Sequence, residues 1–313
     1  MSNKMQDDKT TITNSASFGL ASKVKDYFLL IKFTLSFMVV FSTVVSFLIA
    51  PNEDHYSRNK IISVLLLFVG GMLITGSANA INQVLEKKSD ALMKRTANRP
   101  VASGRMSAAE ATAFAIIAGA IGVFILWYWF NVASALLGLF SLFLYGFIYT
   151  PLKKVNSVSV LVGAIPGALP CLIGWVAATG TYDIGGWVLF AIQFLWQFPH
   201  FWAIAWLAHQ DYTKAGFKLL PSDEGPTKFT ALQTIIYSAL MIPVGLLPYF
   251  VGITNLGTRG IISMVVLLLC NLWMVYVSVQ LFKKMDVGSA KKVMFSSYFY
   301  LMIVLLALFV GRA

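Results

Sequence analysis

The chain has 313 residues, of which 58% are hydrophobic and 12% are charged, and its mean hydropathy is +0.75. Soluble domains carry about twice this charged fraction, so the composition excludes an ordinary soluble globular protein. The net charge of +11 would suggest nucleic-acid binding in a soluble protein, whereas here no nucleic-acid partner is expected. The two cysteines, Cys171 and Cys270, both lie in apolar runs and suggest neither a disulfide framework nor a metal cluster.

Long uncharged segments divide the chain into candidate membrane spans. A bilayer core of about 30 Å is crossed by about 20 apolar residues in a helix. Nine runs meet this requirement, at about 27–50, 60–81, 108–130, 132–150, 157–178, 183–207, 230–253, 260–282 and 293–311. Helices are expected because backbone groups that face lipid must be hydrogen-bonded within their own segment. The predicted fold is an all-α membrane bundle of nine transmembrane helices.

The basic residues are distributed unequally between the two sides of such a bundle. If the N-terminus is cytoplasmic and the helices alternate, 19 of the 24 Lys and Arg residues lie on the cytoplasmic side. This asymmetry follows the positive-inside rule and predicts a cytoplasmic N-terminus and a C-terminus on the opposite side. We expect a polar cytoplasmic tail at 1–25, a single transmembrane domain at 26–313, and a location in a bacterial-type plasma (inner) membrane.

The segment from Asn79 to Arg105 concentrates polarity after the second run. Within it, Asn82, Glu86 and Asp90 are spaced i, i+4 and i+8, which puts three oxygen-bearing side chains in one helical stripe about 12 Å long. Mg²⁺ is typically bound by one or two carboxylates and takes further ligands from water and substrate phosphate. The stripe therefore predicts a magnesium site at the cytoplasmic end of the second span.

Basic side chains follow this stripe at Lys94, Arg95 and Arg99. The guanidinium fork of arginine matches phosphate oxygens, so the cluster is a candidate diphosphate site. The alternative is a solvated loop of mixed charge at a membrane face. Acidic residues are scarce in the chain, with 13 in total. A divalent cation between carboxylates and phosphate would explain why acids and bases gather here.

A second polar cluster follows the sixth run. Gln193, Gln197 and His200 fall at i, i+4 and i+7 of an otherwise apolar, aromatic segment, and Asp211 follows at its cytoplasmic end. Polar side chains within a membrane helix usually face the bundle interior or a cavity. They either contact a substrate or hydrogen-bond to neighbouring helices. Trp196 beside them is a candidate wall for an isoprenoid chain or a π surface for a cation.

Two shorter signals lie elsewhere in the chain. Tyr149 and Lys153 end the fourth run, again on the cytoplasmic side, and supply a phenol and an ammonium group. Lys32 lies within the first run, where a charge is costly unless it faces a cavity or reaches the interface. Its position near the start of the run favours a side chain that snorkels to the interface.

These motifs, taken in order, resemble a known family. The Asn82-x-x-x-Glu86-x-x-x-Asp90 stripe is followed by K-R-T-x-N-R-P at 94–100, Y-T-P-L-K at 149–153, G-A-I-P-G-A-L-P-x-L-I-G-W at 163–175, W-Q-F-P-H-F-W at 196–202 and D-Y-x-x-A-G-F-K-x-L-P at 211–221. They resemble the UbiA superfamily of intramembrane prenyltransferases, and within it the members that farnesylate heme. The resemblance extends over about 27–225, and the ordered set is far more specific than any one motif.

The resemblance implies nine helices around a central cavity, Mg²⁺ as cofactor, and transfer of the farnesyl group of farnesyl diphosphate to a vinyl group of heme b. It also makes heme A synthase and oxidase assembly factors candidate partners. Carried over by position, the catalytic and metal residues are Asn82, Glu86, Asp90 and Asp211; the diphosphate residues are Lys94, Arg95, Arg99 and Lys153; the candidate heme or prenyl contacts are His200, Gln197, Tyr149 and Trp196.

The sequence departs from the family pattern at three places. Glu86 stands where the first motif usually has Asp, and Asp211 is the only acid of a second motif that usually has more. The first run reads Ile31-Lys32-Phe33-Thr34 where many relatives have Lys-Pro-Arg, so a basic contact is expected to be missing. These differences concern the ion geometry and the second metal ion.

Three other functions remain open from the residues themselves. One is a related prenyltransferase that acts on a quinone precursor or another aromatic acceptor. Another is a membrane transporter, although transporter sites usually lie near the midplane and the polar groups here gather near one face. The last is a heme-handling assembly factor without catalytic activity, whose heme binding would not depend on Mg²⁺.

Overall fold

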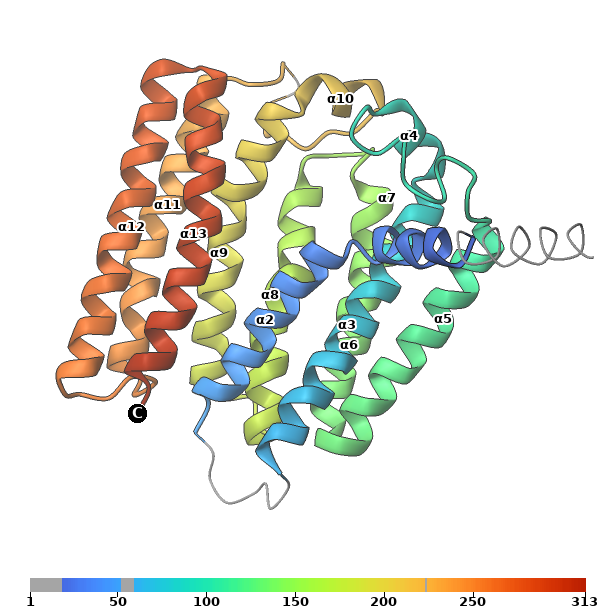
Figure 1. Cartoon of the computed structure of the whole chain (residues 1–313). Helices are drawn as coiled ribbons and strands as arrows, with labels where there is room; N and C mark the ends of the chain where they lie inside the picture. The colour runs from blue at the N-terminus through green and yellow to red at the C-terminus, as the bar shows by residue number, and fades with distance from the viewer. Residues whose placement is uncertain (1–18, 52–58, 223) are drawn as a thin grey trace, which may run out of the picture.

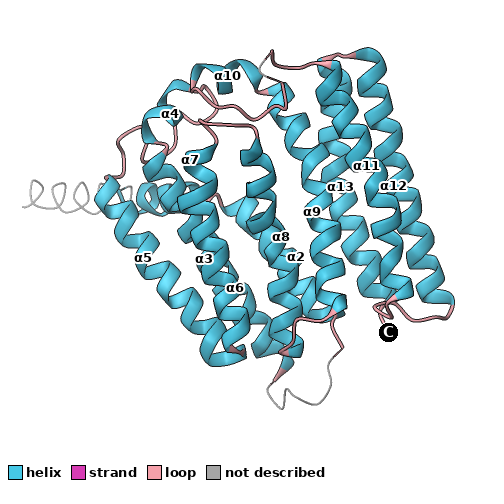
Figure 2. Ribbon diagram, turned by 180° about the vertical axis from the view of Figure 1, so that it is seen from behind, coloured by secondary structure: helices cyan, strands magenta, loops and turns pink. Residues whose placement is uncertain are grey.

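The structure is a computed structural model that describes residues 19–51, 59–222 and 224–313. The described residues form helices and connecting loops without a β-strand (Figure 2). Eight helices are long and apolar enough to cross a membrane, and a bent pair at the start makes a ninth if it counts as one span. The helices stand side by side, and the C-terminus lies at the end of the bundle away from α4 and α10 (Figure 1).

The later eight spans agree with the sequence prediction, with ends that differ by six residues or fewer. They comprise α3 (Lys60–Leu85), α5 (Ala108–Ile125) with η1 (Leu126–Phe130), α6 (Val132–Phe143) with η2 (Leu144–Tyr149) and α7 (Thr150–Leu152), α8 (Val158–Thr179), α9 (Ile184–Leu207), α11 (Lys228–Phe250), α12 (Thr258–Lys284) and α13 (Val287–Gly311). The short helices α4 (Lys87–Leu92) and α10 (His209–Lys214) lie in loops at one end, which we call the α4–α10 face.

Polar side chains set the starts of several spans. Side-chain oxygens of five residues accept hydrogen bonds from backbone N–H groups in the first helical turn: Asn59 for α3, Ser107 for α5, Asn131 for α6, Asp183 for α9 and Asp286 for α13. Such caps satisfy backbone donors that have no partner within the helix. The loop sequences therefore fix where the apolar runs become helical.

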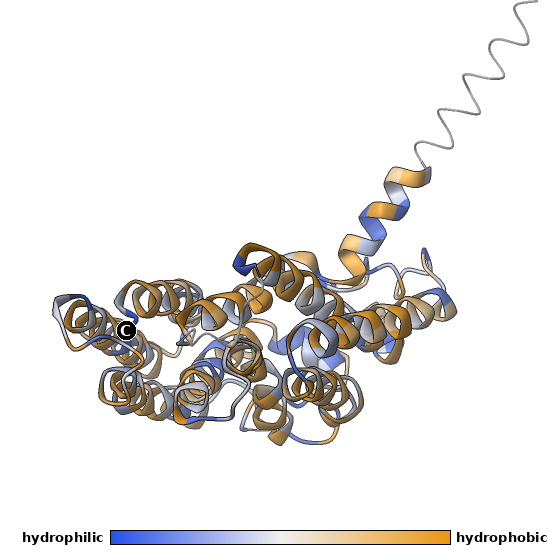
Figure 3. Cartoon of the chain, turned by 90° about the horizontal axis from the view of Figure 1, so that it is seen from below, coloured by the Kyte–Doolittle hydropathy of each residue, from blue (hydrophilic) through white to orange (hydrophobic). Residues whose placement is uncertain are grey.

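The first apolar run does not form the single helix that residues 27–50 predict. A helix over Gly19–Leu30 meets α2 (Phe33–Ile49) at an angle of 52°, and in Figure 3 it projects from the side of the bundle. Lys32 lies at the break with φ 49° and ψ 57°. This left-handed conformation is unfavourable for a residue with a Cβ atom, so contacts elsewhere must stabilise it.

Two amide side chains of α3 provide those contacts. Gln83 Nε2 donates to the carbonyl oxygens of Leu29 and Leu30 at 3.0 and 2.9 Å. Asn79 Nδ2 donates to the Ile31 carbonyl at 3.1 Å. The break leaves the Leu30 and Ile31 carbonyls without backbone donors among the described residues, whereas the Leu29 carbonyl also accepts from Lys32 N at 3.3 Å. In an apolar environment an unpaired carbonyl is costly. The bend is therefore specified by α3 as well as by its own residues.

An apolar cavity lies between α2, α3, α6, η2 and α8. Its lining is mostly aliphatic and includes Leu35, Ile74 and Pro166, with Asn79 and Tyr145 among the polar exceptions. Asn79 lies about one helical turn before Asn82 on α3. The cavity therefore reaches the part of α3 that carries the polar stripe, as a central chamber of the predicted kind would.

We predict that Gln83→Leu destabilises the protein because it leaves the Leu30 carbonyl without a donor and removes one of the two donors to the Leu29 carbonyl. The expected cost is about 1–3 kcal/mol for each buried polar group left unpaired, measured as a lower Tm in detergent. Gln233→Leu, at a partly exposed position of α11, is the control and should leave the Tm unchanged. Equal Tm values for the two variants would show that the bend does not depend on Gln83.

Candidate active site

The three predicted oxygen ligands lie together at the junction of α3 and α4. Asn82, Glu86 and Asp90 are 1%, 4% and 0% exposed, so all three face the protein interior. The stripe is not on one continuous helix, because α3 ends at Leu85 and α4 begins at Lys87. The backbone nevertheless keeps i to i+4 hydrogen bonds, from Glu86 N to Asn82 O and from Asp90 N to Glu86 O. The predicted shared face is therefore preserved through the junction.

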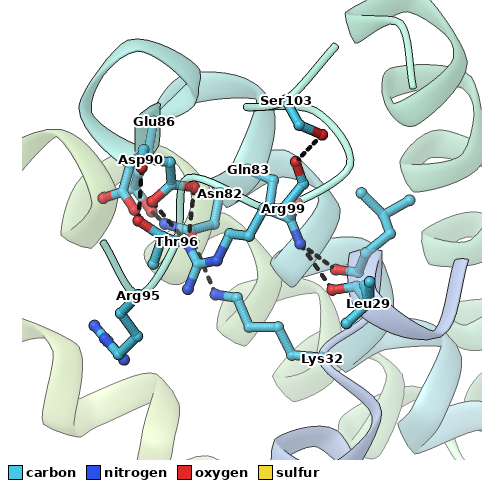
Figure 4. Close-up of polar contacts among 12 residues, drawn as sticks. Leu29, Lys32, Asn82, Gln83, Glu86, Asp90, Arg95, Thr96, Arg99 and Ser103 are labelled. Atoms are coloured by element: carbon cyan, nitrogen blue, oxygen red, sulfur yellow. Dashed lines mark hydrogen bonds and ion pairs between the residues drawn. The ribbon is translucent and has the colours of Figure 1, made fainter. Parts of the chain in front are cut away.

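Each of these residues bonds to a different cationic side chain, and Figure 4 labels Lys32 and Arg99 beside Asn82 and Asp90. Lys32 Nζ donates to Asn82 Oδ1 at 2.9 Å, and Lys153 Nζ donates to Glu86 Oε1 at 2.9 Å. Arg99 Nη1 donates to both carboxylate oxygens of Asp90 at 2.8 Å. Carboxylates this deeply buried require such partners, because desolvation of an unpaired charge costs several kcal/mol. We call these six residues the ion-pair cluster.

The loop after α4 holds Arg99 against Asp90. Thr96 Oγ1 donates to the Asp90 carbonyl at 2.8 Å, and Arg99 N donates to the Thr96 carbonyl at 2.9 Å. Arg105, farther along the loop, pairs with Asp26 Oδ1 at 2.9 Å. Asp26 belongs to the helix Gly19–Leu30. The basic loop therefore forms ion pairs both with Asp90, through Arg99, and with the first helix, through Arg105.

Lys153 reaches Glu86 from the end of the fourth span. The helix widens into a π-helix, η2, immediately before Thr150, and such segments often lie at functional sites. Lys153 is 8% exposed, and its ammonium lies 4.4 Å from the centre of the Tyr149 ring. Asn82 Nδ2 donates to Thr150 Oγ1 at 3.3 Å. The fourth span thus supplies a cation to Glu86 and a hydroxyl to Asn82.

Lys32 does not snorkel to an interface as the sequence suggested. The bend between Leu30 and Phe33 turns its ammonium onto Asn82. This helix therefore supplies one basic contact to the site, through Lys32. Nothing in residues 31–34 predicted the bend, because no proline or glycine stands there.

The second motif lies beside the cluster but does not join it. Arg95 Nη2 donates to the hydroxyl of Tyr212 at 2.9 Å, and Met93 packs with Phe217, so the α10 segment lies against the α4 loop. Asp211 is partly exposed on α10. Within the described residues Asp211 forms no ion pair. Lys94 is exposed to solvent, as is Arg95.

The α9 side chains that were predicted to contact heme or the prenyl chain form hydrogen bonds to neighbouring helices. Gln197 Nε2 donates to the Ala164 carbonyl of α8 at 2.9 Å. Trp196 Nε1 donates to the Ser297 carbonyl of α13 at 2.7 Å, and His200 Nδ1 lies 2.8 Å from Ser297 Oγ. The Trp196 and His200 rings stack, with centroids 4.8 Å apart. These groups join α9 to α8 and α13, which the sequence had left as the alternative to substrate contact.

The oxygen atoms of the cluster fit a magnesium ion that is coordinated partly by the protein and partly by a substrate. Asn82, Glu86 and Asp90 offer only oxygen atoms, which Mg²⁺ prefers. Among the described residues, no group of three or more Asp, Glu, His or Cys side chains is close enough together to hold a metal ion. Phosphate oxygens would therefore have to complete the coordination, as is usual for Mg²⁺.

Several residues of this site have no role in the sequence-based prediction. Asn79 and Gln83 hold the bend, and Thr150 bonds to Asn82. Asn79 and Gln83 flank Asn82 in the sequence, where the second apolar run ends, so amides at the end of a membrane helix were the available signal. The missing information was which of the neighbouring helices each amide contacts, and this depends on packing.

Comparison with known sequences shows which protein family the chain resembles. The sequence profile described as the UbiA prenyltransferase family matches residues 39–308. The chain is similar to the protoheme IX farnesyltransferase of Cytophaga hutchinsonii, with 43% identity over 92% of this chain and 98% of that one. It is also similar to the protoheme IX farnesyltransferase of Flavobacterium johnsoniae, with 42% identity over 89% and 91% of the two chains.

Solved structures show the same arrangement of helices at lower identity. A digeranylgeranylglyceryl phosphate synthase superposes with a TM-score of 0.74 at 21% identity, over 93% of this chain and 98% of that one. A UbiA homolog from Archaeoglobus fulgidus bound to GPP and Mg²⁺ superposes with a TM-score of 0.68 at 16% identity, over 90% and 99%. The chain belongs to the UbiA prenyltransferase family and is a multi-pass membrane prenyltransferase.

Proposed function

We propose that this protein transfers the farnesyl group of farnesyl diphosphate to a vinyl group of heme b and releases diphosphate. The observation that carries the chemistry is the ion-pair cluster, where three cationic side chains and three buried oxygen-bearing side chains meet near an apolar cavity. The names of the relatives, which are 42–43% identical over most of the chain, support heme b as the acceptor.

In this reaction the bond between farnesyl C1 and the diphosphate oxygen breaks, and its electron pair leaves with the diphosphate. The vinyl π electrons of heme form the new C–C bond to C1. Water then adds to the resulting cation and loses a proton, which leaves a hydroxyl group on the product. The barrier depends on how well negative charge is stabilised as it develops on the leaving oxygen.

The basic side chains of the cluster are placed for that task. Lys32, Lys153 and Arg99 already point at the oxygens of Asn82, Glu86 and Asp90. We propose that they turn to the diphosphate oxygens when the substrate binds.

A bound Mg²⁺ would be held by Asn82, Glu86 and Asp90, and as a Lewis acid it would neutralise the charge of both the carboxylates and the diphosphate. Arg95 and Lys94 are proposed to meet the outer diphosphate oxygens, since both are exposed at the same loop.

The cavity between α2, α3, α6 and α8 has a volume of about 90 Å³ and is proposed to hold part of the farnesyl chain, because its lining is mostly apolar. It would also keep water from the allylic cation until the new bond has formed. The Tyr149 ring lies 4.4 Å from the Lys153 ammonium, and Tyr149 is proposed to shield the prenyl end. His200, Trp196 and Gln197 remain candidate heme contacts, and the aromatic stack of α9 against α13 supports an apolar surface there.

The proposed orientation places the α4–α10 face in the cytoplasm, with the N-terminus on that side. Lysines at the turn between α12 and α13 lie on the same face as the basic α4 loop (Figure 1), which supports the positive-inside assignment. The proposed location is a bacterial-type plasma membrane. A second metal ion at Asp211 and handover of product to heme A synthase or oxidase assembly factors belong to the same proposal.

Lys153→Met tests the role of the cluster in catalysis. The change removes the partner of buried Glu86 and one cation from the proposed diphosphate site, so we expect at least about a hundredfold loss of kcat. Lys154→Met, which removes an exposed charge one residue away, should keep kcat within about twofold. The measurement is farnesyl transfer by purified protein in detergent, and equal rates for the two variants would refute this role.

The acceptor is tested by offering heme b or 4-hydroxybenzoate to purified protein with isotope-labelled prenyl diphosphates of several chain lengths. The proposal predicts label in heme, with a mass gain of one farnesyl unit plus water, and no transfer to 4-hydroxybenzoate. Label in 4-hydroxybenzoate and none in heme would favour the quinone-precursor enzyme. Heme binding without any transfer, unaffected by Mg²⁺, would favour the assembly factor.

A further inference from the structure

A second cavity lies between α12 and α13, at one edge of the bundle (Figure 1), and has a volume of about 710 Å³. This size is within the range of ligand pockets, about 300–1,000 Å³. Its walls include Trp273 and Tyr276 of α12 and Phe295 and Phe299 of α13, which are 53–67% exposed. These aromatic rings therefore face the surroundings of the bundle, and we call this feature the α12–α13 groove.

The charge of the groove is confined to one end. Lys284, Lys291 and Lys292 line the end at the α4–α10 face, and Gln280 lies one turn below Lys284. The acid nearest to them in sequence, Asp286, is already engaged, because its Oδ1 accepts a hydrogen bond from Ser289 N at 2.6 Å. This hydrogen bond lowers the pKa of Asp286 below its ordinary value. The groove thus joins a cationic head to an apolar, aromatic body.

The length of the groove matches one leaflet of a bilayer. From Lys284 to Leu269, which lines the other end, the helical rise amounts to about 22 Å. Half of a bilayer including its headgroup region is about 20–22 Å. A cationic site at headgroup depth with an apolar channel below it has the dimensions and the charge of an anionic phospholipid.

We propose that the α12–α13 groove binds one anionic phospholipid, with the phosphate at Lys284, Lys291 and Lys292 and an acyl chain along the aromatic rings. Basic pockets between membrane helices are a common form of anionic lipid site. The groove is a different site from the ion-pair cluster, whose residues lie between Lys32 and Lys153 in the first half of the chain. A hydrogen bond of 3.0 Å from Trp273 Nε1 to Ser296 Oγ joins its two walls, so a bound lipid would bridge α12 and α13 at a place where they already meet.

The test is native mass spectrometry of the full chain in detergent, titrated with phosphatidylglycerol or with phosphatidylethanolamine of the same acyl chains. The first phosphatidylglycerol should bind about tenfold more tightly than phosphatidylethanolamine, given three lysines at the headgroup. The variant Lys284→Gln/Lys291→Gln/Lys292→Gln should lose this preference. The control Lys25→Gln/Lys228→Gln/Lys283→Gln removes the same charge from exposed lysines that do not line the groove and should keep it.

The aromatic walls are tested by Trp273→Ala/Phe299→Ala. This variant should reduce the affinity for both lipids by a similar factor, because it removes apolar contact area with the acyl chain. Equal binding of the two lipids by the wild type would overturn the proposal. So would an undiminished preference in the groove variant, or the same loss in both lysine variants. Displacement of the lipid by stoichiometric heme b, or a protein dimer that excludes lipid, would assign the groove to a different occupant.

Discussion

The site depends on the pairing of buried charges at one end of an apolar bundle. Glu86 and Asp90 are almost fully buried, and each carboxylate would be strongly destabilising without its cation. The same pairing that stabilises the folded protein also brings three cations and three oxygen ligands into one place. In the proposed mechanism, a divalent cation held by the carboxylates would free these cations for an anionic leaving group. Stability and catalysis would then use the same atoms.

This arrangement is possible because several helices each contribute one part of it. The bend in the first span supplies Lys32, and α3 holds that bend through Asn79 and Gln83. The widened end of the fourth span supplies Thr150 and Lys153. The amides of Asn79 and Gln83 donate to carbonyls at the bend, where the helical backbone hydrogen bonds are interrupted. The polar residues of α3 are thus structural supports and ligand candidates at the same time.

Much of the fold follows from the sequence, because apolar runs of sufficient length have one stable form in a bilayer. The eight later spans were predictable for this reason. The clustering of Asn82, Glu86 and Asp90 was predictable from their spacing of four residues on a helix, and the basic loop that includes Arg99 was visible in the sequence. The placement of Lys32 was not predictable, because its bend arises from hydrogen bonds to α3 and from no proline or glycine of its own. Gln197 and His200 show the same limit, since a polar stripe does not reveal whether it meets a substrate or another helix.

Calorimetric titration of purified protein with farnesyl diphosphate, without heme and with or without Mg²⁺, tests the shared role of the cluster most directly. If Mg²⁺ takes the carboxylates while the cations turn to the diphosphate, tight binding requires Mg²⁺, and Asp90→Asn removes this requirement together with most of the affinity. Asp183→Asn, which keeps the capping oxygen of α9, should behave as the wild type. Equal affinity with and without Mg²⁺, unchanged in Asp90→Asn, would contradict the account.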